Sequence, residues 1–119
     1  MEKKQLIDRI NTQFKGNLNS QNTSYSGINK AKAVWWFNIH VSKFEDDVHL
    51  LLDNTDHVLW ITLPKSFVSN LQGTFKIRED KNAVDLEISA DSKLLYLRDR
   101  KSGGTGFDFR GFVRDKIGF

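Results

Sequence analysis

The stretch AVWWFNIHV, residues 33–41, decides the fold class of this chain. Its odd-numbered positions are all apolar, whereas its even-numbered positions mix apolar and polar side chains. Successive residues of a β-strand point to opposite faces of a sheet, so this alternation predicts a strand whose odd-numbered side chains face a core. Trp36, Asn38 and His40 are then expected to share the other face.

The segments around this strand predict a mainly β fold with little helix. Leu6, Ile7, Ile10 and Phe14 recur at helical spacing, and residues 16–31 are rich in Asn, Ser and Gly, as is typical of a loop. Short consecutive strands favour an α+β fold whose antiparallel sheet, of about six or seven strands, curls into a barrel or half-barrel. The expected strands are residues 33–41, 47–52, 58–63, 74–80, 83–89, 94–98 and 107–113, with one short helix between residues 64 and 73.

A β-hairpin is the most sharply predicted local structure. A two-residue turn at Lys81 and Asn82 would align residues 74–80 with residues 83–89. That register matches apolar with apolar side chains on one face and opposite charges on the other, and such pairs stabilise a sheet. The expected cross-strand pairs are Phe75 with Ile88, Lys76 with Glu87, Ile77 with Leu86 and Arg78 with Asp85.

Length and composition predict one domain, residues 1–119, with a helix in 1–15, a polar loop in 16–31 and a β-rich core in 32–113. The chain has no cysteine, which excludes a disulfide scaffold, thiolate metal ligands and a cysteine nucleophile. It has no apolar run of transmembrane length, and its N-terminus is too polar for a signal peptide. We therefore expect a soluble, cytoplasmic protein without a membrane partner.

The charges are unevenly distributed along the chain. Residues 1–43 carry seven Lys and Arg against two acids, and residues 93–119 carry seven against three. Residues 44–64, in contrast, carry five acids and no Lys or Arg. Basic ends can attract a polyanion through phosphate contacts, although a net charge of +3 is also ordinary for solubility.

Two groups of residues are candidates for nucleic-acid contact. Cations bracket the Gly-rich residues 102–106, and arginine next to flexible backbone suits phosphate binding. An exposed Trp36 could stack on a base, whereas packing of Trp36 beneath the N-terminal helix is the structural alternative. The candidate binding residues are Lys30, Lys32, Trp36, Asn38, His40, Arg98, Arg100, Lys101, Arg110 and Arg114.

The histidines give no metal motif. His40, His49 and His57 have no short ligand spacing, and surface pairs of His49 with Asp47 and of His57 with Asp56 are expected instead. No metal ligand, cofactor or catalytic residue is assigned. Trp35, Phe37 and Trp60 are expected in the core.

The leading hypothesis is a non-enzymatic nucleic-acid-binding module, with DNA favoured over RNA. A protein-interaction or assembly domain of a larger bacterial system, or a homo-oligomer, is the first alternative, because residues 47–52 and 58–63 are apolar on both faces. A Mg²⁺-dependent nuclease is the second, since Glu79-Asp80-Lys81 and Asp99-Arg100-Lys101 resemble acid-x-Lys triplets, with Asp53 or Asp85 as the upstream carboxylate.

Overall fold

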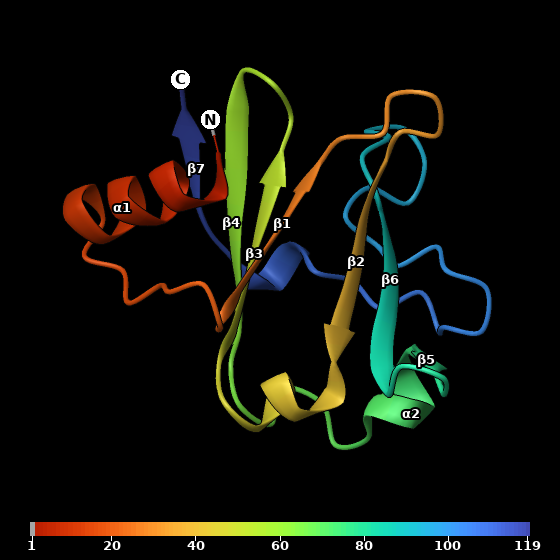
Figure 1. Ribbon diagram of the computed structural model, residues 1–119. Helices are drawn as coiled ribbons and strands as arrows, with labels where there is room; N and C mark the ends of the chain where they lie inside the picture. The colour runs from red at the N-terminus through yellow and green to blue at the C-terminus, as the bar shows by residue number, and fades with distance from the viewer. Residues whose placement is uncertain (1) are drawn as a thin grey trace.

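The computed structural model describes residues 2–119 and confirms a mainly β fold (Figure 1). The helices and strands, in chain order, are α1 (Lys3–Gln13), β1 (Thr23–Gly27), β2 (Val34–His40), the 3-10 helix η1 (Val41–Glu45), β3 (Val48–Asp53), β4 (His57–Leu63), α2 (Leu71–Thr74), β5 (Lys76–Arg78), β6 (Ala83–Ser89), the 3-10 helix η2 (Arg110–Phe112) and β7 (Val113–Gly118). Neither α1 nor α2 has the length and hydrophobicity that crossing a membrane requires, within residues 2–119.

The strands form two sheets, and neither closes into a barrel. The four-stranded sheet has the order β1-β3-β4-β7, with β1 parallel to β3 and the other pairs antiparallel. The three-stranded sheet has the order β2-β6-β5 and is antiparallel throughout. In Figure 1 the first sheet lies on the left and the second on the right. The single curled sheet expected from the sequence is therefore corrected to two sheets that share a core.

The main core lies between the two sheets. The odd-numbered residues of β2, Trp35, Phe37 and Ile39, are buried in it, as the alternation of residues 33–41 predicts. Alternate residues of β3, β4 and β6 fill it from the other strands. Packing of two inner sheet faces is the usual way to bury one apolar side of each sheet.

A second core lies on the outer face of the four-stranded sheet, beneath α1. Leu6, Ile7 and Ile10 are buried there. Full burial of an apolar side chain of this size stabilises the folded state by about 1.5–3 kcal/mol. The backbone N–H of Glu2 donates to Oε1 of Gln5 at 2.9 Å, which closes the start of the helix. α1 therefore packs on the second apolar face of β3 and β4.

The hairpin of β5 and β6 exists, but its predicted register is wrong by two residues. Lys76 pairs with Asp85 and Ile77 with Val84, so the connection spans four residues, 79–82. Lys81 N donates to Arg78 O at 3.2 Å and tightens this turn. A shift of two residues leaves each side chain on its predicted face, because the strand period is two.

Four further segments differ from the predictions. Residues 16–31 contain β1, whose pairing with β3 is hidden by its polar composition. Residues 94–98 form no strand, because Leu95 and Leu97 have positive φ angles of 55° and 59°. The final strand is β7 rather than residues 107–113, since η2 interrupts that stretch before pairing with β4 begins. The short helix is limited to α2, at the end of the predicted segment.

Candidate functional site

The outer face of the three-stranded sheet carries the polar-aromatic group predicted from β2. Trp36 is 47% exposed, and Asn38 and His40 are also exposed on the same face. Trp36 lies opposite Glu87 on β6, and Asn38 lies opposite Asp85. Because α1 covers the other sheet, the alternative in which Trp36 packs beneath the helix is wrong.

Two lysines precede this strand in the connection from β1. Lys30 and Lys32 are both exposed, and Lys32 N donates to Oδ1 of Asn29 at 3.1 Å. The Lys32 ammonium lies 5.6 Å from the centre of the Trp36 ring, within the range of a cation–π contact. The backbone N–H of Trp36 donates to Oγ of Ser26 at 3.2 Å, so the strand is fixed at the point that carries the indole.

Two of the predicted C-terminal cations form ion pairs within the chain. Arg110 donates to both carboxylate oxygens of Asp108, at 3.0 and 2.7 Å, and this pair lowers the pKa of Asp108 and raises the pKa of Arg110. The Lys101 ammonium lies 3.3 Å from Oδ2 of Asp85. These contacts leave less positive charge for a ligand than the sequence indicates.

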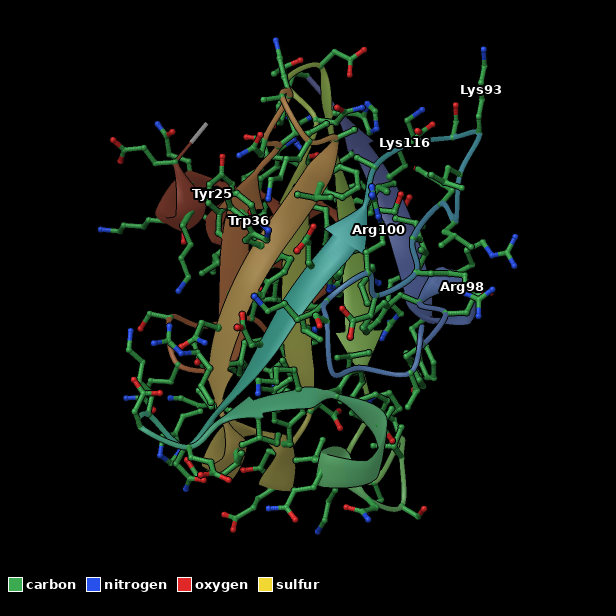
Figure 2. All side chains as sticks on the ribbon, turned by 90° about the vertical axis from the view of Figure 1, so that its right-hand side faces the viewer. Tyr25, Trp36, Lys93, Arg98, Arg100 and Lys116 are labelled. Atoms are coloured by element: carbon green, nitrogen blue, oxygen red, sulfur yellow. The ribbon has the colours of Figure 1, made fainter. Side chains whose placement is uncertain are left out.

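The other three C-terminal cations lie apart from one another. Arg98 Nε donates to the carbonyl of Gly106 at 2.8 Å and so holds the Gly-rich loop. Arg100 is exposed and forms no ion pair within residues 2–119. Figure 2 shows Arg100 beside the end of β6, with Arg98 and Lys93 at other places on the loop that follows this strand. Arg114 belongs to a different surface, described below.

The Gly-rich loop closes over a buried carboxyl group. Asp99 is 3% exposed, and its Oδ1 accepts from Glu87 N at 3.2 Å and from Lys101 N at 3.0 Å. Its Oδ2 has no hydrogen-bond partner within the described chain, and burial raises the pKa of Asp99. A Cβ at Gly104 would lie 2.6 Å from that Oδ2. The glycine is therefore needed for close packing on Asp99.

The two acid-x-Lys triplets have structural contacts. Glu79, Asp80 and Lys81 lie in the hairpin turn, where Arg78 pairs with Asp80 at 3.1 Å. The second triplet supplies the Asp99 and Lys101 contacts described above. Across residues 2–119, no three His, Asp or Glu side chains converge as metal ligands would.

A polar groove of about 790 Å³ lies on the outer face of the four-stranded sheet. It lies beyond the part of the sheet that α1 covers; one wall is the segment between α1 and β1. Its floor contains His49 and Thr62, which face each other across β3 and β4. We call this cavity the polar groove.

Three side chains form a hydrogen-bonded group at the floor of the polar groove. Trp60 Nε1 donates to His49 Nδ1 at 3.1 Å, and Oγ1 of Thr62 lies 2.9 Å from the same nitrogen. An indole N–H only donates, so Nδ1 is an acceptor and the proton of neutral His49 is on Nε2.

The pKa of His49 is lowered, mainly by burial. The negative charge of Asp47 acts against this shift, and the positive charge of Arg114 adds to it. His49 is 7% exposed, so the predicted surface pair with Asp47 is wrong, whereas Trp60 is buried as predicted.

The last predicted cation, Arg114, lines this groove. Trp60 pairs with Asp115 and Ile61 with Val113, so Arg114 is the extra residue of a β-bulge in β7. Its guanidinium lies 4.9 Å from the centre of the Trp60 ring. The bulge therefore directs Arg114 away from the other C-terminal cations and over the indole.

Sequence reasoning missed the polar groove, because its residues come from four separate segments. The one signal was the placement of His49 and Thr62 within strands that are otherwise apolar. His57 does form the expected surface pair, with Nδ1 at 2.5 Å from Oδ1 of Asp56.

Comparison with known proteins gives no match to a family model, a curated protein sequence or a solved structure.

Proposed function

We propose that this protein binds nucleic acid, with DNA favoured over RNA, and that it acts in the cytoplasm. The observation that carries the proposal is Trp36, a large aromatic side chain that is about half exposed within β2. Proteins that bind single strands use such rings as stacking platforms, because every base has a π-face. The face around Trp36 therefore suits unpaired or distorted nucleic acid better than an intact duplex.

The cations nearest to this face would contact phosphates. Lys32 already lies over the indole, and a stacked base would leave its ammonium free to meet the adjoining phosphate. Lys30 precedes the strand, and Arg100 lies beside β6, where its backbone N–H donates to the carbonyl of Glu87 at 2.6 Å. Asn38 and His40 extend the same face and offer hydrogen bonds to base edges or phosphates. Arg98, Lys101 and Arg110 would contribute less to phosphate binding, because their side chains already contact groups of this chain.

A matched pair of substitutions tests the role of Trp36. Trp36→Ala removes the stacking ring, whereas Leu94→Ala removes an apolar side chain that is 51% exposed in a different part of the fold. Fluorescence anisotropy with a labelled single strand should show a loss of roughly 5- to 150-fold for Trp36→Ala, the equivalent of about 1–3 kcal/mol for one stacked base. Leu94→Ala should bind like the wild type. Equal binding by the wild type and Trp36→Ala would reject the assignment.

A protein-interaction role is the second candidate, and a different observation favours it. Leu94 and Leu95 are both about half exposed in the loop after β6. Exposed neighbouring apolar side chains are typical of contact surfaces. Light scattering across a concentration series would show a rise in mass if this loop supports self-association, and a constant monomer mass would remove the homo-oligomer form of the hypothesis.

A further inference from the structure

The polar groove presents hydrogen-bond donors that have no acceptor within residues 2–119. His49 Nδ1 is occupied by Trp60, which leaves the Nε2–H of this groove-lining side chain as a free donor. The guanidinium of Arg114 forms neither a hydrogen bond nor an ion pair in the described chain, and its Cζ lies 4.9 Å from the centre of the Trp60 ring. A guanidinium held over an aromatic ring has N–H groups available for a planar or tetrahedral oxyanion.

We propose that the polar groove is a binding site for a small molecule that carries an oxyanion, either a carboxylate or a phosphate. The oxyanion would lie between Arg114 and the Nε2–H of His49, and Lys65 from the same groove would add positive charge. This site lies on the outer face of the four-stranded sheet, whereas Trp36 lies on the outer face of the three-stranded sheet. The two proposals therefore rest on different residues and can fail independently.

Trp60 organises both donors in advance of binding. Its Nε1–H fixes the tautomer of His49, and its ring supports Arg114 at 4.9 Å. The β-bulge places Arg114 over that ring, and bulges commonly redirect side chains next to binding sites. Donors held in place before binding lose less conformational entropy when the ligand arrives.

The wall of the groove is also fixed by hydrogen bonds. Asn11 on α1 accepts from Leu18 N at 2.9 Å and donates to Leu18 O at 2.8 Å, which anchors the segment that forms this wall. Farther along, Asn19 Oδ1 accepts from the backbone N–H of Asn22 at 2.9 Å. The amide-lined wall is thus a defined surface.

Acidic residues also line the groove and add a second requirement for the ligand. Glu45, Asp46 and Asp47 line it together with the cations. Asp47 Oδ1 accepts from the backbone N–H of Lys65 at 2.8 Å, so one of these carboxylate oxygens already has a hydrogen-bond partner. The remaining carboxylates would accept hydrogen bonds from hydroxyl or amino groups. The ligand class is therefore a polar metabolite that carries both an oxyanion and hydrogen-bond donors.

The test is a titration of ¹⁵N-labelled protein followed by NMR at constant ionic strength. The probes are sodium phosphate, sodium acetate and, as a neutral control, glucose. The readout is the indole N–H signal of Trp60, identified by its loss in Trp60→Phe. The matched variants are Arg114→Gln and Lys116→Gln, because both remove an exposed positive charge from β7 and only Arg114 lines the groove. Thermal unfolding confirms that each variant is folded.

The expected result is a saturable shift of the Trp60 indole signal with phosphate or acetate. Arg114→Gln should weaken the binding of that probe by about tenfold or more, as for the loss of one hydrogen bond to a charged group, and Lys116→Gln should change it by less than about twofold. The tighter of the two anions identifies the oxyanion. No shift with either anion, an equal response to glucose, or equal weakening by the two variants would overturn the proposal.

Discussion

Trp60 on β4 donates its indole N–H to Nδ1 of His49 on β3 at 3.1 Å. This contact is compatible only with neutral His49, because both ring nitrogens of an imidazolium are donors. Burial lowers the pKa of His49 in the same direction. The contact therefore links the stability of the fold to pH.

The first prediction concerns this link. The folded pKa of His49 lies below its ordinary value of 6.5, so between the two values the unfolded chain binds more protons than the folded chain. The stabilisation is fully present above pH 6.5, and the free energy of unfolding falls as the pH drops below it. His49→Gln keeps an acceptor for Trp60 without titrating. Urea unfolding at a series of pH values should show a smaller loss in the variant, whereas parallel curves would contradict this assignment.

The second prediction separates the hydrogen bonds that the Asp99 carboxyl group accepts from the effect of its negative charge. Asp99→Ala removes the acceptor for Glu87 N and Lys101 N, so we expect it to destabilise the fold by about 1–3 kcal/mol for each unpaired donor. Asp99→Asn keeps that acceptor and removes the buried ionisable carboxyl group, whose pKa is raised by burial. Denaturant midpoints near neutral pH should therefore place the asparagine variant close to the wild type and the alanine variant well below it. Equal losses in the two variants would show that the charge itself is required.

The third prediction concerns the packing of the Gly-rich loop on Asp99. Gly104→Ala would bring a methyl group to 2.6 Å from Oδ2 of Asp99, and overpacking of this kind costs about 1–3 kcal/mol. Gly111→Ala is the matched control, because a Cβ there has no neighbour within 4 Å. Thermal melts should show a clear loss for Gly104→Ala and little change for Gly111→Ala. A similar melting temperature for both variants would mean that the loop does not pack tightly on Asp99.

The fourth prediction concerns the side-chain anchor of β1. Tyr25 donates its hydroxyl to the carboxylate of Asp53, and burial together with this contact raises the pKa of Tyr25 to about 12. Tyr25→Phe removes the hydroxyl and leaves Asp53 with its remaining bond from Thr55 N at 2.8 Å. Absorbance titration of this variant should lose the ionisation near pH 12 and keep that of Tyr96, whose pKa is also raised by burial. Ionisation of every wild-type tyrosine near pH 10 would contradict the buried contact.

Strand periodicity was sufficient to predict the faces of β2. Trp35 and Trp36 are neighbours with opposite environments, and the alternation of residues 33–41 assigns both correctly. Helical spacing likewise predicts α1. The hairpin register failed because two registers that differ by two residues place the same side chains on the same faces. Turn geometry, including the positive φ of Asn82, decides between them.

The candidate sites likewise divide into features that local sequence pattern predicts and features that depend on tertiary structure. Local pattern identified the Trp36 face, whereas clustering along the sequence suggested that five C-terminal cations act together. In the fold, Arg110 pairs with Asp108, and the β-bulge turns Arg114 toward the polar groove. The His49–Trp60 contact joins two strands through a register that sequence alone does not specify. Residues brought together by tertiary pairing were therefore beyond local pattern analysis.

Binding of labelled single- and double-stranded DNA and RNA across a salt series tests the proposed function most directly. The proposal predicts measurable binding at low salt, a preference for single strands, and a linear fall of log K with log salt, with a slope of about −0.7 for each phosphate contacted in a single strand. DNA is expected to bind more tightly than RNA. No binding to any of these ligands at low salt would contradict the proposed function.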